Sequence, residues 1–183
     1  RSRRQRQMCI RDSSDNGGCA EEPGGRSPKI VPGPKEFYAA VGPSWGWAQN
    51  SPFRHYKSWA HEGGIATPCI AWWPGRVPRG GITGEVGHII DFMPTFLELG
   101  DGSYPKEFKG NKILPVEGKS LVSVLRGQTR KGHKQLAWEW SGNRALREGK
   151  WKVVWDKADK RWELFDLVAD RTETTDLAAK YPD

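Results

Sequence analysis

The last third of the chain alternates apolar and polar side chains with a period of two residues, and this pattern restricts it to short β-strands. The alternation covers residues 136–140, 144–147, 151–155 and 162–167. Gly142-Asn143, Gly149-Lys150 and a charged stretch at 156–160 separate these runs and supply the turn chemistry that short hairpins need. The sequence therefore predicts a four-stranded antiparallel sheet, with a helix against it from about Asp176.

The first two thirds read as irregular structure with short regular elements. Residues 1–14 have no usable period, 17–34 are broken by glycines and prolines, and 45–56 predict a loop with a helical turn. Residues 65–73 form an apolar run rich in β-branched and aromatic side chains, which predicts a buried strand.

Two short helices are predicted after that strand. Residues 88–99 place apolar side chains close to one helical face, with a start or bend near Met93 because Pro94 lies inside the run. Gly100 marks the end of this helix, and residues 121–125 predict the second one.

Composition indicates a folded but loop-rich chain. The 183 residues include 22 glycines and 13 prolines, and only 36% are hydrophobic, which is low for a globular protein. Ten tryptophans nevertheless indicate packing, because a disordered chain has little use for so much aromatic surface. The length allows one domain, or one domain and part of another.

The net charge of +7 does not indicate a nucleic-acid binder. Five arginines and no acidic residue lie within residues 1–11, so most of the excess positive charge is terminal and is not spread over a folded surface. No apolar run reaches membrane-spanning length, so neither nucleic acid nor a membrane is an expected partner. The three cysteines, Cys9, Cys19 and Cys69, lack the spacing of a disulfide framework or a zinc site. Residues 1–11 also lack the pattern of a signal peptide, which leaves localisation open from composition alone.

Five groups of residues, in order along the chain, resemble motifs of the sulfatase family, specifically its arylsulfatases, within the alkaline-phosphatase-like superfamily. They are SDNGG at 14–18, PFRHYK at 52–57 with EGG at 62–64, HIIDFMPT at 88–95, EGKSL at 117–121, and WELFDL at 162–167 with DRTE at 170–173. The resemblance runs from about residue 14 to the end of the chain.

The resemblance implies an α/β fold: the C-terminal part of an alkaline-phosphatase-like sulfatase sandwich, plus a small antiparallel four-stranded sheet with a helix. It divides the chain into three parts. Residues 1–13 are a leader foreign to the family, 14–134 belong to the main α/β domain, and 135–183 form the C-terminal sheet subdomain, expected to be truncated. Periplasmic or secreted localisation is likewise an expectation from the family.

The family uses a formylglycine nucleophile, made from Cys or Ser in a C/S-x-P/A-x-R motif, and a divalent metal, usually calcium. By resemblance, Asp15 and Asn16 are metal ligands, since adjacent carboxylate and amide oxygens suit Ca²⁺. From the residues alone, an Asp-Asn-Gly turn is the competing interpretation.

Lys57 corresponds to the family's catalytic lysine, which contacts the substrate sulfate and assists the leaving oxygen. A lysine suits this role as a compact cation with three donors, whereas a solvated surface lysine is the alternative. Trp45 and Trp47, just upstream, are candidates for the rim of an aromatic or sugar substrate site. His55 and His61 are interpreted as surface or helix-end histidines rather than as hydrogen-bond donors behind the active site.

The chain also departs from the family. It contains no C/S-x-P/A-x-R motif and no early aspartate pair, so it holds no nucleophile of its own. The sequence therefore predicts the C-terminal part of a sulfatase acting on a sulfated small molecule or sulfated carbohydrate, with the formylglycine upstream. Two alternatives stay open: a non-catalytic sulfatase-like binding module, and a phosphomonoester or phosphonate hydrolase of the same superfamily.

Overall fold

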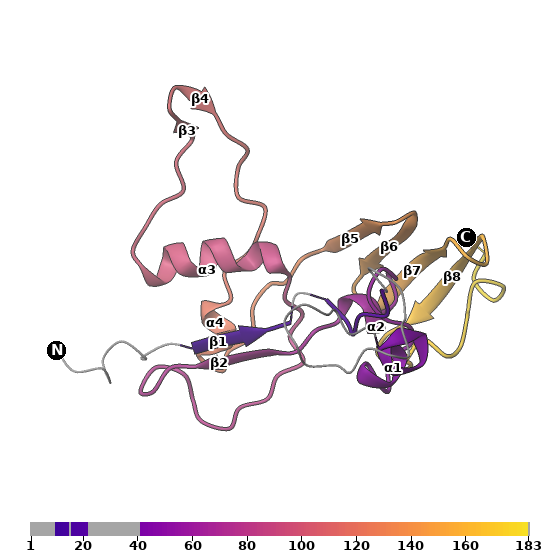
Figure 1. The fold of residues 1–183 in the computed structure, drawn as a ribbon. Helices are drawn as coiled ribbons and strands as arrows, with labels where there is room; N and C mark the ends of the chain where they lie inside the picture. Colours follow the sequence, from indigo (N-terminus) through magenta and orange to yellow (C-terminus); the bar gives the residue numbers. More distant parts are fainter. Residues whose placement is uncertain (1–9, 15, 22–40, 183) are drawn as a thin grey trace, which may run out of the picture. The chain divides into compact units, whose positions relative to one another are not determined.

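The computed structural model describes residues 10–14, 16–21 and 41–182 (Figure 1). The chain divides into two compact units, each built from two stretches of sequence. One unit contains residues 1–12 and 70–133, and the other contains 13–69 and 134–183. The three-part division at residues 13 and 134 remains a prediction.

The second unit is built on the predicted sheet. Four antiparallel strands follow one another in chain order, namely β5 (Gln135–Trp140), β6 (Asn143–Glu148), β7 (Trp151–Asp156) and β8 (Arg161–Asp166). Ser141 and Gly142 form the first turn with φ values of 52° and 83°, the pair of positive values that a two-residue type I′ hairpin requires. The sheet prediction is confirmed in strand number, order and boundaries to within one or two residues.

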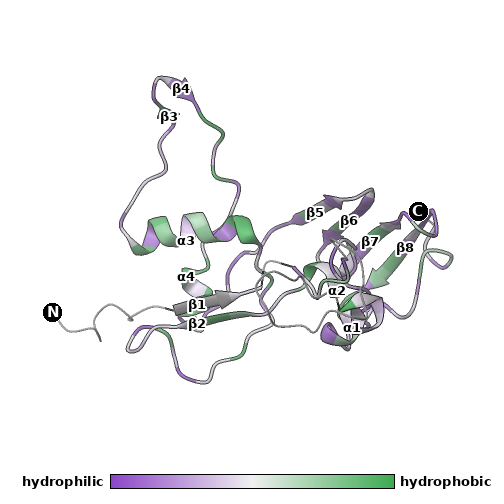
Figure 2. Cartoon of the chain, viewed as in Figure 1, coloured by the Kyte–Doolittle hydropathy of each residue, from purple (hydrophilic) through white to green (hydrophobic). Residues whose placement is uncertain are grey.

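A small apolar core lies on one face of this sheet. It consists of Ala60, Ala145, Val154, Phe165 and Leu167, with Trp138 packed against it. Ala60 comes from the segment that leads into the short helix α2 (Glu62–Ile65), so this segment packs directly on the sheet. Hydrophobic and hydrophilic residues are mixed along β7 and β8 (Figure 2).

The buried face of β7 carries charge. Lys152, Val154 and Asp156 are buried, whereas Trp151, Val153 and Trp155 on the other face are only partly buried. The Nζ atom of Lys152, a residue with 0% exposure, lies 2.9 Å from Glu62 Oε1 and 2.8 Å from Glu173 Oε1.

The two carboxylates of this network are also tied to each other. Glu173 Oε2 accepts a hydrogen bond from the backbone N–H of Glu62 at 2.6 Å. Burial raises the pKa of Glu173, while Lys152 favours its ionised form. The Lys152–Glu62–Glu173 network therefore fastens α2 and residue 173 to the sheet.

The first unit contains several short elements. These are the 3₁₀ turn η2 (Ile89–Asp91), α3 (Phe92–Leu99), α4 (Val122–Leu125), the hairpin of β3 (Glu107–Phe108) and β4 (Asn111–Lys112), and all but one end residue of each strand in a two-stranded sheet of β1 (Ile10–Ser13) and β2 (Cys69–Trp72). Both predicted helices are present. Gly100 follows α3 with φ −101°, so it ends the helix without the left-handed conformation.

Asp91 joins two of the sequence motifs within this unit. Its carboxylate accepts hydrogen bonds from the N–H of Lys119 at 2.8 Å, from Arg130 Nη2 at 2.8 Å and from His133 Nε2 at 2.6 Å. Burial works against the ionised form, but these donors together hold the pKa of Asp91 below its usual value. Leu121 also donates its N–H to Thr95 Oγ1 at 2.8 Å, so EGKSL packs onto HIIDFMPT through buried polar contacts.

Several expectations were wrong. Residues 42–49 form a full helix, α1 (Gly42–Gln49), because Pro43 sits in its first turn where no N–H is needed. Ile10–Ser13 is a strand although the sequence shows no period there, because pairing with β2 supplies the backbone hydrogen bonds. The run at 65–73 yields only β2, whose side chains are mostly exposed rather than buried.

The helix expected from Asp176 is also absent: residues 176–182 form turns. The N–H groups of Lys180 and Tyr181 both donate to Leu177 O, while Asp176 Oδ1 accepts from the N–H of Leu164 and of Ala178. This side-chain bonding competes with helix formation. Among the described residues, no helix is both long and apolar enough to cross a bilayer.

Replacing Lys152 tests the buried network. Lys152→Met keeps most of the side-chain volume but leaves the buried carboxylate of Glu173 without its cation and Glu62 with only the more distant Arg171, at 3.6 Å. We expect this change to lower the free energy of unfolding by about 3–5 kcal/mol. Urea denaturation monitored by tryptophan fluorescence measures the loss.

Lys150→Met is the matched control for this loss. Lys150 forms an equally short ion pair, 2.7 Å to Asp166, but its side chain is 49% exposed, so we expect an effect below about 1 kcal/mol. Equal losses in the two variants would show that burial of the network does not stabilise the fold.

Candidate functional site

Two of the sequence motifs meet in the second unit, residues 16–21 and the segment at 54–64. The backbone N–H of Lys57 donates to Gly18 O at 2.9 Å, and the N–H of Gly17 donates to Gly64 O at 3.1 Å. A Cβ atom on Gly17 would collide with the carbonyl of Gly63. This contact explains the glycine at position 17, while at Gly64 a Cβ atom would collide with the carbonyl oxygen of Trp59.

Asn50, just after α1, holds the crossing in place. Its side-chain Oδ1 accepts from the N–H of Gly18 at 2.7 Å, while its Nδ2 donates to Gly46 O at 2.8 Å and to His55 O at 3.2 Å. Three backbone segments are thus connected through one side chain. Sequence reasoning missed this residue, because an asparagine at the end of a helix is common and carries no signal of such a role.

Lys57 lies on a tightly constrained loop. The residues on either side, His55 and Ser58, have φ values of 64° and 80°, a left-handed conformation that costs about 1–2 kcal/mol for a residue other than glycine. Lys57 Nζ donates to Glu21 Oε2 at 2.9 Å, and the two side chains are 31% and 51% exposed. This hydrogen bond is the main reason that the pKa of Glu21 is lowered. The loop therefore presents a cation at a half-exposed position.

Aromatic rings surround the backbone of this loop. His55 stacks on Trp59 at a centroid distance of 4.0 Å and an angle of 8°, and Trp47 lies 4.9 Å from His55 and 6.5 Å from Tyr56. The structure thus places Trp47 against the stretch at 52–64 that carries Lys57, which we call the lysine segment. Trp45 is 68% exposed.

Trp47 also lines a pocket of about 390 Å³. The other lining residues come from the lysine segment, from β8 and from the stretch that follows it: Pro52, Arg54, Arg161, Glu163, Thr172, Glu173, Thr174 and Asp176. Arg54 and Arg161 both bind Glu163, at 3.1 and 2.8 Å, so part of their charge is neutralised inside the pocket.

The predicted metal ligands can be placed only in part. Asp15 lies outside the described residues, whereas Asn16 is half-buried and immediately precedes the crossing of Gly17 with Gly64. Carboxylate and amide oxygens fit calcium in chemical kind, but Ca²⁺ takes six to eight oxygen ligands. Asp15 and Asn16 would supply only part of that shell.

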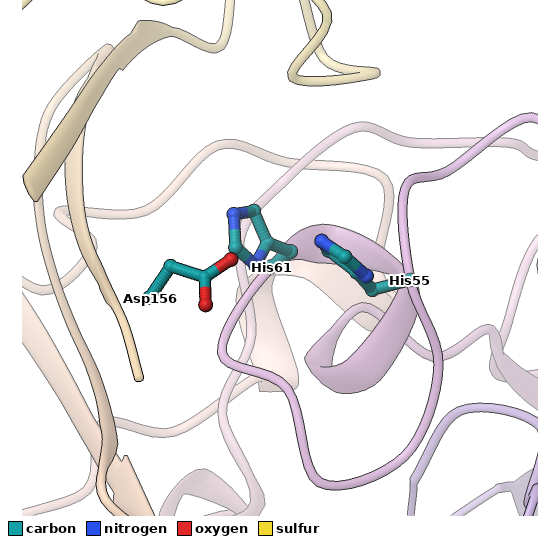
Figure 3. Close-up of side chains that lie close together, drawn as sticks. All are labelled: His55, His61 and Asp156. Atoms are coloured by element: carbon teal, nitrogen blue, oxygen red, sulfur yellow. The ribbon is translucent and has the colours of Figure 1, made fainter. Parts of the chain in front are cut away.

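The two histidines of the lysine segment were assigned wrongly to the surface. His61 directly precedes α2, as a helix-end residue does, but it has 0% exposure, and its Nε2 lies 2.7 Å from Glu163 Oε2. His55 is half-buried, and both histidines lie close to Asp156 at the end of β7 (Figure 3). Their spacing of six residues gave no hint of this cluster, because it forms only when the segment packs on the sheet.

Comparisons with known proteins agree with the motifs. A family model described as N-sulphoglucosamine sulphohydrolase, C-terminal, matches residues 53–181. An uncharacterised sulfatase of Schizosaccharomyces pombe is 32% identical over 148 residues, which cover 78% of this chain and 27% of that protein. The N-acetylgalactosamine-6-sulfatase of Canis lupus familiaris is 32% identical over 110 residues, covering 51% of this chain and 20% of the relative.

A solved structure, Ps i-CgsB in complex with k-i-k-neocarrahexaose, matches in fold with a TM-score of 0.67 and 20% identity. The match covers 98% of this chain and 35% of the other. The chain thus spans less than a third of the length of the two curated relatives.

The predicted fold class, the α/β C-terminal part of a sulfatase with its four-stranded antiparallel sheet, is confirmed by this likeness. The family model covers well over half of the 183 residues and includes both the lysine segment and the whole sheet. The chain belongs to the sulfatase family and corresponds to the C-terminal region of its members.

Proposed function

We propose that this chain is the C-terminal part of an arylsulfatase-type enzyme that hydrolyses sulfate monoesters to an alcohol or phenol and sulfate. The observation that carries the proposal is the backbone hydrogen bond from Lys57 to Gly18, together with that from Gly17 to Gly64. These bonds hold the backbone of Lys57 beside Gly18, two residues after Asn16. A lysine close to metal-binding oxygens would suit a sulfate ester, because the ester's oxygens need both a metal and a hydrogen-bond donor.

Lys57 acts on the sulfate group in this proposal. When the S–O bond to the alcohol breaks, negative charge grows on the leaving oxygen, and an aimed ammonium group stabilises that charge. The Lys57 ammonium forms an ion pair with Glu21. An exposed ion pair of this kind stabilises a protein by only about 0–1 kcal/mol. A sulfate group that also binds a metal would compete with Glu21 for the same donor.

The remaining chemistry belongs to groups outside the described residues. A formylglycine in an upstream part of the protein would supply the nucleophile, and a divalent metal, Ca²⁺ by family resemblance, would neutralise the sulfate oxygens. Asp15 and Asn16 would hold that metal in part. The positive φ values at His55 and Ser58 and the hydrogen bond from Asn50 to His55 O constrain the backbone of the loop that carries Lys57.

We propose a sulfated carbohydrate as the substrate, with a sulfated small molecule as the alternative. The pocket beside Trp47 supports this choice through its indole face, which suits a sugar ring. Its two arginines, Arg54 and Arg161, are paired with Glu163 and carry no part of the argument. Trp45 is exposed and remains a weaker candidate for the rim. Periplasmic or secreted localisation is proposed from the family resemblance alone.

A non-catalytic binding module is the second candidate. It is favoured by one observation: the 183 residues contain no C/S-x-P/A-x-R motif, so they hold no formylglycine precursor. The two proposals differ in whether a protein that includes the upstream region has such a motif and turns over sulfate esters.

We expect the 183-residue chain by itself to show no sulfatase activity. Covalent catalysis cannot proceed without its nucleophile, and the chain holds at most part of a metal shell. Incubation with an aryl sulfate, with and without a chelator, measures the rate. Hydrolysis above background that the chelator abolishes would contradict the assignment of the nucleophile to an upstream region.

In a protein that joins these residues to an upstream sulfatase region, we expect Lys57→Ala to reduce kcat about a hundredfold with little change in the melting temperature. The reason is the loss of one charged donor at the developing charge, worth on the order of 3 kcal/mol in the barrier. Lys57→Arg should restore only part of the rate, because a planar guanidinium cannot replace a point-charge donor at a crowded tetrahedral anion.

Lys150→Ala is the control for this measurement, since it removes an ion-paired, half-exposed lysine outside the lysine segment. Steady-state kinetics on an aryl sulfate and thermal melts should be recorded for all variants. Near-normal turnover in Lys57→Ala would show that Lys57 is a surface lysine without a role in the reaction.

A further inference from the structure

Three buried or partly buried metal-ligating side chains, His55, His61 and Asp156, lie together in the second unit. One ligand atom from each lies within 4.8 Å of the corresponding atoms of the other two (Figure 3). Among the described residues, this is the one group of three such side chains that is close enough to bind one ion. His55 lies within the PFRHYK motif, but neither that resemblance nor the proposed reaction gives the side chains of His55, His61 and Asp156 a role.

Each histidine has a buried ring nitrogen without a hydrogen-bond partner among the described residues. These atoms are His55 Nε2 and His61 Nδ1. A buried polar atom that makes no hydrogen bond costs free energy, so two of them side by side indicate that something binds there. The rings are 4.5 Å apart at their centroids.

The tautomer of His61 is set by its other nitrogen. Nε2 lies 2.7 Å from a carboxylate oxygen of Glu163, so Nε2 carries the proton and donates it to Glu163. Nδ1 is then left with a free lone pair. A carboxylate that orients the far nitrogen of a histidine is the usual support behind a metal ligand.

Burial surrounds both imidazoles. It is the main cause that lowers the pKa of His61 to about 3 and that of His55 to about 4. The proposal itself stands on the positions of the three side chains and on the two ring nitrogens without hydrogen-bond partners.

Asp156 supplies an anionic oxygen from the sheet. Its Oδ1 accepts from the N–H groups of Ala158 and Asp159 at 2.7 and 3.2 Å, which fixes the carboxylate at the start of the β7–β8 turn. Figure 3 shows this carboxylate directed toward the ring of His61. With 2% exposure, it is a buried acid that no Lys or Arg side chain pairs with among the described residues.

We propose that His55, His61 and Asp156 bind a divalent transition-metal ion of the zinc class. Three atoms within 4.8 Å of one another leave a point about 2.8 Å or less from each, and zinc bonds of about 2.0–2.2 Å then require each ligand to move by under about 1 Å. Two imidazoles and one carboxylate suit Zn²⁺ and related ions, whereas Ca²⁺ takes oxygen ligands. The site is therefore distinct in chemistry from the one proposed for Asp15 and Asn16.

Such an ion would connect the lysine segment to the C-terminal sheet. His55 lies two residues before Lys57 and His61 four residues after it, while Asp156 belongs to β7. The metal would thus fix both ends of the loop that carries Lys57. This inference stands independently of sulfatase activity, because its evidence lies in the geometry of the cluster alone.

Zinc binding to the full chain tests the proposal. The chain is freed of metal with a chelator, titrated with ZnSO₄ against a chromophoric competitor, and its zinc content is measured after dialysis. We expect one equivalent of bound zinc and a higher melting temperature with zinc than with the same concentration of calcium. Co²⁺ in place of zinc should give the intense visible absorption of a tetrahedral site.

His55→Asn and His88→Asn are the matched pair. Each removes one of the chain's four histidines, and asparagine tolerates the φ of 64° at position 55. We expect zinc affinity to fall about tenfold or more in His55→Asn and to stay unchanged in His88→Asn. Asp156→Asn is the second variant; it keeps the oxygen that caps the turn and should also lose affinity.

Three outcomes would overturn the proposal: no stoichiometric zinc in the wild-type chain, equal zinc affinity in His55→Asn and His88→Asn, or unchanged affinity in Asp156→Asn. Equal affinities would assign the zinc to Cys19, Cys69 or other surface groups. In a longer protein that has sulfatase activity, His55→Asn could lose zinc binding and keep its turnover. That result would support the metal site and would not contradict the proposed reaction.

Discussion

The contact between Lys152 and the carboxylates of Glu62 and Glu173 is the interaction on which the second unit depends. A lysine with 0% exposure on the core face of a sheet is tolerated only where opposite charge meets it, and here the charge comes from α2 and from the stretch after β8. The apolar core beside it is small, with five buried residues. The network therefore decides which segment covers the sheet, since any other segment would leave Lys152 unpaired.

This requirement explains where sequence reasoning succeeded and where it failed. The four strands and their turns were predictable, because a period of two residues and glycine turns are local signals. The buried face was not: hydrophobicity along β7 favours Trp151, Val153 and Trp155, yet the face with Lys152 and Asp156 is buried. The reason is tertiary, because the carboxylates that pair with Lys152 come from distant stretches of the chain: Glu62 lies 90 residues earlier, and Glu173 follows β8.

The candidate site also has a part that could be predicted from the sequence and a part that could not. The motifs around Asn16 and Lys57 were recognisable from their residues, and the structure brings them together through Gly18 and Gly64. The residues that position them were not recognisable, because Asn50 and Glu21 are ordinary polar side chains outside any motif. Likewise, β1 could not be seen in the sequence, since its backbone partner β2 and not its side chains makes it a strand.

The segment from Arg54 to Gly64 has one half-exposed side and one buried side. One side holds Lys57 half-exposed, and the other holds His61 and Glu62 buried against the sheet, only four and five residues further on. Arg54 and His61 both contact Glu163 of β8, so the loop is anchored before and after Lys57. The sheet thus holds the short segment that presents Lys57. Substitutions on the buried side should act on stability and on the position of Lys57 together, whereas substitutions of the half-exposed Lys57 itself should change stability little.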